Sequence, residues 1–180
     1  MLLDRAKSCL LVIDLQEKLI GAMSAGAEVV ANTGILLKAA ERLGIPFLFS
    51  EQYPKGLGPT VAALAPYAAK AGPVTKTEFS CAEAPGYLEQ LRAAGREQLV
   101  LTGIEAHVCV LQTALGMKER GFPVFVVADA VSSRKPESAA LAIERMRAGG
   151  VTVVTTEMVL FEWLGRAGTA EFKELSALIK

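Results

Sequence analysis

The sequence is poor in the residues that build metal sites and disulfide frameworks. It has one histidine, His107, and three widely separated cysteines, Cys9, Cys81 and Cys109, among 180 residues. A single histidine excludes a site with several imidazole ligands, and a Ser-His-Asp triad would have to use it. An odd number of distant cysteines matches neither a disulfide framework nor a zinc site. We therefore expect reduced thiols and no metal.

Neither sign of charge is in excess, and long apolar runs are missing. Lys and Arg number 19, as do Asp and Glu. No basic stripe favours a nucleic-acid partner. There is no apolar run of about 18 residues to span a membrane. Asp4, Arg5 and Lys7 interrupt the N-terminus, which argues against a signal peptide. We expect a cytoplasmic protein without membrane or nucleic-acid partners.

What the sequence does have is a regular alternation of short apolar runs and longer helical stretches. With 52% hydrophobic residues, a chain of this length can bury a core, and we expect one domain over residues 1–180. Strands are predicted at 9–13, 45–49, 73–76, 98–102, 123–127 and 151–155. Helices are predicted at 26–43, 60–70, 83–94, 108–120, 136–148 and 169–179, and a loop at 51–59.

These strands are continuously apolar instead of alternating, which is typical of a parallel sheet covered on both faces. Strand-helix alternation then predicts an α/β fold with three αβα layers. In such sheets the ligand crevice lies at the carboxyl ends of the strands. The reactive residues at or just after predicted strand ends are Asp14, Lys76, Cys109 and Asp129.

Cys109 follows the predicted strand at 98–102 closely enough to lie in the first turn of a helix. The partial positive charge there, and a nearby Lys76, would lower the thiol pKa and favour the nucleophilic thiolate. The free amides of that turn could bind an oxyanion. Asp14 would act the other way, so that the two groups titrate as a coupled unit. The alternative is that Cys109 is only a small buried hydrophobe. We predict that it alone of the three cysteines reacts at neutral pH. Cys9 is expected to be buried, and Cys81, even if accessible, lacks a group that stabilises its thiolate.

Asp14 is a better candidate base than His107. Residues two apart on a helix point to opposite sides, which separates His107 from Cys109. Asp14 follows a buried strand, where a carboxylate without a partner would be costly. Each candidate has a simpler alternative: Asp14 as a helix N-cap, Lys76 as a solvated surface lysine, and Asp129 as the cap of the next turn.

Three segments together resemble the isochorismatase-like cysteine hydrolases. They are LVIDLQ at 11–16, KTEFS at 76–80 and GIEAHVC at 103–109. The loop EQYPKGLG at 51–58 and the stretch 127–134 are similar to the isochorismatase domain-containing proteins of that family. The resemblance covers nearly the whole chain, and the motifs occur in the family's order, each at a strand end.

The resemblance implies a strand order of 3-2-1-4-5-6 and a catalytic triad of Asp14, Lys76 and Cys109. It also implies a cis peptide at Ile104–Glu105, which would aim the Glu105 amide, with that of Cys109, at the oxyanion. Gln16 and Phe79, within the matched motifs, would contact the substrate.

The chain departs from the family's nicotinamidases at one motif. Where they carry an Asp-x-His metal motif, this chain reads QYP at 52–54, which argues against a catalytic metal. We expect no cofactor.

The leading interpretation is a small-molecule hydrolase that cleaves an amide or related C–N bond through a thioester. Two alternatives stay open: vinyl-ether hydrolysis of the isochorismatase type, and a non-catalytic oligomeric binding module on the same fold. The family and the apolar, Ala-rich composition suggest a homo-oligomer.

Overall fold

The centre of the molecule is a parallel sheet of six strands in the order β3-β2-β1-β4-β5-β6. The computed structural model describes residues 1–179. The strands are β1 (Ser8–Ile13), β2 (Phe47–Gln52), β3 (Val74–Lys76), β4 (Gln98–Ile104), β5 (Val124–Ser132) and β6 (Thr152–Val154). Every neighbouring pair is parallel. The predicted fold class and strand order are confirmed.

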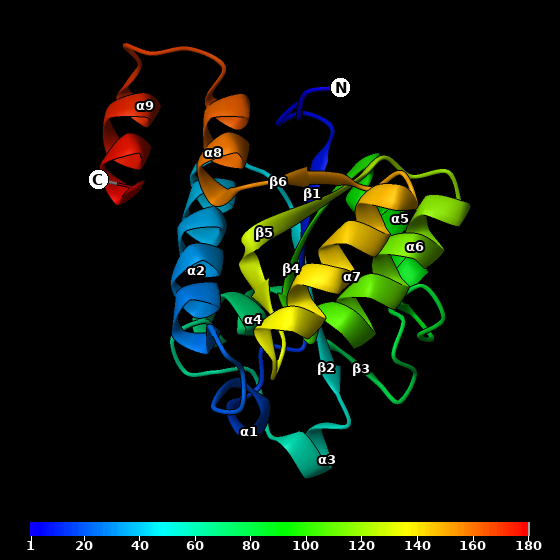
Figure 1. The fold of residues 1–180 in the computed structure, drawn as a ribbon. Helices are drawn as coiled ribbons and strands as arrows, with labels where there is room; N and C mark the ends of the chain where they lie inside the picture. Colours follow the sequence, from blue (N-terminus) through cyan, green and yellow to red (C-terminus); the bar gives the residue numbers. More distant parts are fainter. Residues whose placement is uncertain (180) are drawn as a thin grey trace.

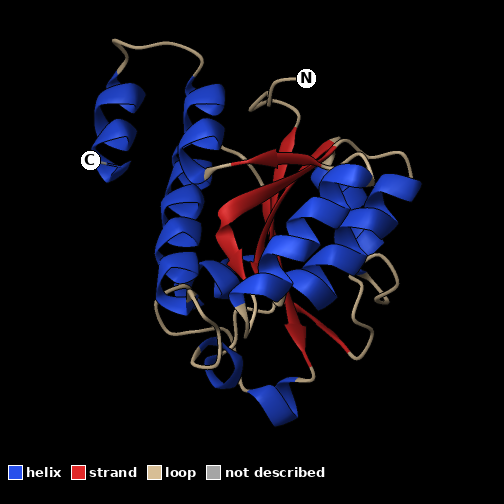
Figure 2. Ribbon diagram, viewed as in Figure 1, coloured by secondary structure: helices blue, strands red, loops and turns tan. Residues whose placement is uncertain are grey.

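Helices cover both faces of the sheet, as the apolar strands predict. They are α1 (Glu17–Ile20), α2 (Gly26–Leu43), α3 (Pro54–Leu57), α4 (Ala65–Ala71), α5 (Tyr87–Ala94), α6 (Leu111–Glu119), α7 (Pro136–Ala148), α8 (Thr156–Leu164) and α9 (Ala170–Leu175). Figure 1 shows α2, α8 and α9 on one side of the sheet and α5, α6 and α7 on the other. Figure 2 shows the same three layers by element type. Within residues 1–179, no helix is both long and apolar enough to cross a bilayer.

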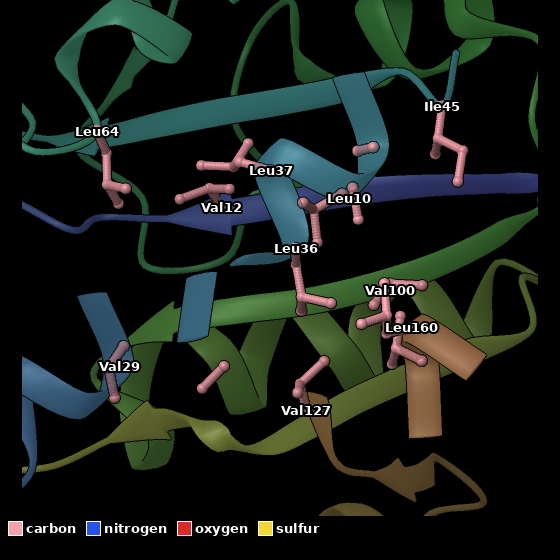
Figure 3. Close-up of a cluster of buried hydrophobic side chains, with 14 of the residues drawn as sticks. Leu10, Val12, Val29, Leu36, Leu37, Ile45, Leu64, Val100, Val127 and Leu160 are labelled. Carbon is pink, nitrogen blue, oxygen red and sulfur yellow. The ribbon is translucent and has the colours of Figure 1, made fainter. Parts of the chain in front are cut away.

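Two apolar clusters fill the spaces between the sheet and its helices. Along β1, Leu10 and Val12 belong to the cluster under α2, whereas Leu11 and Ile13 belong to the cluster under α5 to α7. Figure 3 shows Leu10 and Val12 beside Leu37 of α2. Each fully buried aliphatic side chain contributes about 1.5–3 kcal/mol to stability. This packing fixes the position of each strand along its own axis, and with it the position of the carboxyl ends of the strands.

Two strands run further than the apolar pattern predicts. β2 continues through Ser50, Glu51 and Gln52, so the predicted loop at 51–59 begins only at Tyr53 and contains α3. β5 runs to Ser132, and its register with β4 shifts between Leu101 and Gly103. Polar residues are tolerated at these strand ends because they face the edge of the sheet where a site can form.

The prediction omitted α1, α3 and α8, began two helices too early and extended the last one beyond α9. α8 has a helix start signal, since the Thr155 hydroxyl accepts from the amide of Met158, and it ends at a left-handed Gly165. Asp129, expected after a strand, lies inside β5 and accepts from the amide and hydroxyl of Thr156 at 2.8 and 2.9 Å. It therefore caps α8, a helix distant in sequence. The helices predicted at 60–70 and 83–94 begin later, as α4 and α5.

Candidate active site

The carboxyl edge of the sheet brings together three predicted side chains from three strand ends. Asp14 follows β1 directly, Lys76 ends β3, and Cys109 lies in a π-helical turn (Ala106–Val110) after β4. All three are buried, with 0%, 3% and 7% of their surface exposed. The charges of Asp14 and Lys76 both act on the Cys109 thiol. Burial of all three together strengthens their electrostatic coupling.

Asp14 is held by partners on both carboxylate oxygens. Lys76 donates from Nζ to Oδ2 at 2.8 Å, and Ser50 donates from Oγ to Oδ1 at 2.7 Å. Its backbone is left-handed, with φ 52°, which turns the chain sharply at the end of β1. The N-cap alternative is wrong, because Gln16 occupies the N-cap position of α1 and there is no side-chain cap bond.

Lys76 is a buried cation surrounded by acceptors, and the alternative of a solvated surface lysine is wrong. Besides Asp14, Nζ donates to Gln52 Oε1 at 2.6 Å and to the carbonyls of Glu78 and Phe79, both at 3.2 Å. Burial is the largest single effect and acts to lower the pKa of Lys76, but the charge and hydrogen bond of Asp14, together with Cys81 and Cys109, outweigh it and the pKa is raised. Lys76 therefore remains an ammonium at neutral pH and cannot serve as a general base.

The Cys109 thiol has a raised pKa, which corrects the expectation of a lowered one. Burial is the largest cause, and the negative charge of Asp14 acts in the same direction; Lys76 lowers the pKa by less. The sequence argument counted the lysine and the helix end but not the cost of removing a thiolate from water. The resting thiol is neutral, so it must lose its proton to a base as it reacts.

The turn that carries Cys109 is held at its start by one carbonyl. Glu105 O accepts from the amides of Val108 at 3.0 Å and Val110 at 3.2 Å. The bond from the Val110 amide is the first that reaches back five residues, as in a π-helix. The Cys109 amide therefore precedes the regular π-helical hydrogen bonds of this turn. The peptide between Ile104 and Glu105 is cis.

Gly103, just before this segment, lies directly against β1. It has φ +124°, and a Cβ there would come within 2.0 Å of the Ile13 carbonyl oxygen. Only glycine permits this approach. The backbone leading to Cys109 is thereby pressed against the residue that precedes Asp14.

Gln16 and Phe79 both lie beside the site, in different ways. Gln16 is fully buried; its Nε2 donates to the carbonyls of Gln52 at 2.9 Å and Gly58 at 2.7 Å, and its Oε1 accepts from the Gln52 amide at 2.8 Å. Its amide thus ties the end of β2 to the following loop. The Phe79 carbonyl accepts a hydrogen bond from Lys76, and the residue as a whole is 54% exposed.

Three further residues belong to this neighbourhood and were missed. Ser50 and Gln52 bind Asp14 and Lys76 from the polar end of β2, and the run Ser-Glu-Gln after an apolar strand was the available signal. Cys81, whose accessibility the sequence left open, is completely buried. Burial, followed by the charge of Asp14, raises its pKa despite the opposing effect of Lys76. It could not be located from sequence because its environment depends on α6, whose Thr113 hydroxyl binds its amide at 2.9 Å.

His107 points to a different environment from Cys109. Its Nδ1 lies 2.8 Å from Ser133 Oγ, so it is not paired with the thiol, as expected from its spacing. A cavity of about 370 Å³ opens beside Lys76 and is lined mainly by residues 53–55, 75–78 and Pro85. Among residues 1–179, no group of three or more His, Cys, Asp or Glu side chains is arranged to hold a metal ion.

The matching family model is that of the isochorismatase domain, and it covers residues 8–158. The chain belongs to the isochorismatase-like hydrolase family. It is 42% identical to isochorismatase domain-containing protein 2 of Danio rerio, over 96% of this chain and 86% of that protein. The human protein of the same name is 37% identical over 96% of this chain and 83% of its own.

Solved structures of relatives have the same isochorismatase-like fold. The MAR1 ribonuclease of Caenorhabditis elegans is 38% identical, with a TM-score of 0.89 over 99% of this chain and 92% of its own. The Escherichia coli protein YcaC, described as an octameric hydrolase of unknown specificity, is 24% identical, with a TM-score of 0.92 over 99% of this chain and 90% of its own. At that identity YcaC supports the fold alone.

Proposed function

We propose that this isochorismatase-family chain hydrolyses an amide or related C–N bond of a small molecule, with Cys109 as nucleophile. The observation that supports it most is the fully buried ion pair of Asp14 and Lys76, 2.8 Å apart, whose charges act on the thiol. Burying two charges has a desolvation cost of several kcal/mol per ion. A thiol, a carboxylate and an ammonium gathered at the carboxyl edge of a parallel sheet are suited to nucleophilic catalysis.

The proposed reaction uses Asp14 twice as a proton carrier. Asp14 accepts the thiol proton while the Cys109 sulfur attacks the substrate carbonyl carbon. The C–N bond then breaks, the amine leaves with the proton held by Asp14, and a thioester remains on Cys109. Water attacks the thioester as Asp14 takes its proton; the carboxylic acid leaves and the thiol regains its proton.

The other residues orient charge during these steps. Lys76 keeps the Asp14 carboxylate in place through its contact with Oδ2. The amides of Glu105 and Cys109, at the beginning of the π-helical turn, would donate to the developing oxyanion. Removing one such donor typically costs about 10²–10³ in kcat. Gln16 would position the Gln52 strand end, and the exposed Phe79 ring would contact substrate at the rim.

The two other interpretations have less support from the geometry. Vinyl-ether hydrolysis does not require a thioester, so it would not explain why Cys109 lies beside Asp14 and Lys76. A purely structural binding module has no use for a buried ion pair, which a set of apolar residues could replace without loss of stability. Both are distinguished from C–N hydrolysis by the products formed.

The decisive experiment is a substrate panel combined with trapping of the intermediate. The panel contains small amides, carbamoyl compounds, isochorismate and, because the C. elegans relative is described as a ribonuclease, a short RNA. We expect saturable release of amine from one amide or carbamoyl class and an acid-quenched acyl adduct on the Cys109 peptide. Cys109→Ala should abolish both, whereas Cys9→Ala, in the middle of a core strand, should retain them. Turnover in Cys109→Ala would refute the proposal.

We further propose that the protein is a homo-oligomer. Met158 and Phe161 of α8 are large apolar side chains that are 52% and 41% exposed. Contiguous exposed apolar surface marks an interaction site more often than isolated residues do. Sedimentation equilibrium should give a mass above the monomer value of 19.0 kDa, and a monomeric result at micromolar concentration would refute it.

A further inference from the structure

A second cavity lies on the far side of the π-helical turn from the proposed nucleophile. It consists of two adjoining hollows of about 310 and 200 Å³, which share His107 and Ser138. The first is also lined by Arg134 and Lys135, and the second by Leu111, Leu141, Ala142 and Arg145. We call this pair of hollows the His107 cavity.

The first hollow has a cationic lining. Arg134, Lys135 and His107 contribute nitrogen-bearing side chains, and no carboxylate is part of the wall. Arg134 donates from Nε to Glu105 Oε2 at 2.8 Å, which offsets part of its charge. Within residues 1–179, its other guanidinium N–H groups and the Lys135 ammonium have no carboxylate partner. An ammonium without a carboxylate partner, beside a guanidinium that is only partly neutralised, favours an anionic group in the hollow.

The second hollow is apolar and shares His107 and Ser138 with the first. Leu111, Leu141 and Ala142 form its wall, with Arg145 beside them. Leu141 is 66% exposed, and only Leu2, next to the N-terminus, is a more exposed leucine. A ligand that covered Leu141 would remove apolar surface from water, which is favourable by about 25 cal/mol per Å².

The His107 cavity and the active centre use opposite faces of one turn. His107 and Leu111 are four residues apart and share a face, and both line the cavity. Cys109 lies between them in sequence and faces the buried Asp14 and Lys76. The outer wall is α7, which packs against both the turn and α6; Figure 1 shows α6 and α7 side by side on this face of the sheet.

We propose that the His107 cavity is a binding site, separate from the Asp14–Lys76–Cys109 centre, for a small organic anion with an apolar portion. The anionic group lies between Lys135 and Arg134, and the apolar portion covers Leu141 and Leu111. The charge and the apolar wall are both required, because either alone gives only weak and unspecific attraction at an exposed surface. The inference does not depend on the reaction proposed above.

The test uses three probes of the same size, which differ only in the head group. They are benzoate, phenyl phosphate and neutral benzyl alcohol, titrated into Cys109→Ala protein and monitored by chemical shifts of backbone amides. This variant removes the thiol, so covalent capture cannot contribute. We expect saturable shifts centred on residues 134–142 for one or both anions, with affinity at least about fivefold above that of benzyl alcohol. Benzoate and phenyl phosphate together distinguish a carboxylate from a phosphate ligand.

Two cavity variants and two matched controls locate the binding. Lys135→Ala and Leu141→Ser, both at exposed positions, should each weaken the anion by about threefold to tenfold. Lys173→Ala and Leu2→Ser, which are exposed and distant from the cavity, should leave it unchanged. Three results would overturn the proposal: no saturation at about 10 mM probe, equal binding of the neutral probe, or shifts at residues 14 and 76 that the cavity variants do not alter.

Discussion

The Ser50 hydroxyl donates a hydrogen bond to Oδ1 of Asp14 at 2.7 Å, while Lys76 binds the other carboxylate oxygen, Oδ2. The carboxylate is therefore fixed from two strands, β2 and β3, while it is itself attached to β1. In the proposed reaction this leaves Asp14 oriented with its remaining lone pairs toward the thiol. Ser50 acts through Asp14 and is a positioning residue.

The first prediction concerns Ser50→Ala. Loss of this hydrogen bond should lower kcat by about tenfold with little change in KM, because the base is less well oriented. Ser8→Ala is the control: Ser8 is also buried and accepts from Trp163 Nε1 at 2.9 Å, so stability should fall without a change in kcat. Equal kinetics in both variants would remove the positioning role.

The second prediction separates alkylation from turnover in Asp14→Asn. The charge of Asp14 raises the pKa of Cys109, so its removal should lower that pKa and increase the thiolate fraction near pH 8. Iodoacetamide should then label Cys109 several-fold faster than in the wild type, while turnover falls by about 10² or more because the base is missing. Peptide mass spectrometry reads the labelled site. Slower labelling in Asp14→Asn would contradict the electrostatic account.

Lys76→Met is the opposite test. Lys76 lowers the pKa of Cys109, so labelling should slow. The variant also leaves Asp14 without its cation, which typically costs about 3–5 kcal/mol of stability, and a thermal melt must establish that it is folded. In the wild type, Cys9 and Cys81 have no exposed surface, so neither should label before Cys109; faster labelling of Cys81 would count against the assigned nucleophile.

The third prediction is that activity does not depend on a divalent metal. The nicotinamidases of this family carry an Asp-x-His motif that begins at the position of Gln52. Here the Gln52 side-chain amide accepts a hydrogen bond from Lys76 at 2.6 Å and donates one to the Thr77 carbonyl at 2.9 Å. The residue at the position that would begin a metal motif therefore binds Lys76 instead. Dialysis against a chelator should leave kcat unchanged, and a loss restored by zinc or iron would disprove the prediction.

The fourth prediction follows from Cys9, in the middle of β1. Burial raises its pKa from 9.0 to about 12, so the folded chain holds this proton more tightly than the unfolded chain. Its contribution to stability is complete below pH 9 and is lost as the pH rises through 12. The unfolding free energy should therefore decline more steeply in the wild type than in Cys9→Ala between pH 9 and 11, by an amount of the order of 1–3 kcal/mol. Urea titrations measure it, and parallel slopes would argue against it.

The sequence was sufficient for the parts of the fold that depend on local pattern. Continuous apolar runs such as 9–13 and 98–102 identify strands buried on both faces, and they lead directly to a parallel sheet with a site at its carboxyl edge. The strand ends Asp14 and Lys76 could be named for the same reason. α8 was within reach too, because Thr155 and Gly165 mark its two ends.

What the sequence did not reveal depends on three-dimensional environment. The sign of the Cys109 pKa shift is set by how completely the turn is covered, and spacing carries no measure of that. Cys81 is buried because α6 packs over it, and Ser50 reaches Asp14 only because β2 extends past its apolar part. Contacts between distant segments of this kind require coordinates.

The contact between Gly103 and Ile13 also bears on how freely the chain can change its chemistry by mutation. With a Cβ at Gly103 only 2.0 Å from the Ile13 carbonyl oxygen, every other amino acid would separate β4 from β1 and so move Cys109 away from Asp14. The surrounding segments 53–59 and 79–86 lie outside the sheet, where surface connections tolerate changes in length and composition better than strands do, although Gly58 and Gly86 have positive φ. A change of substrate is therefore open to gradual evolution through these segments, while the distance between Asp14 and Cys109 stays fixed by Gly103, a position with one permitted residue.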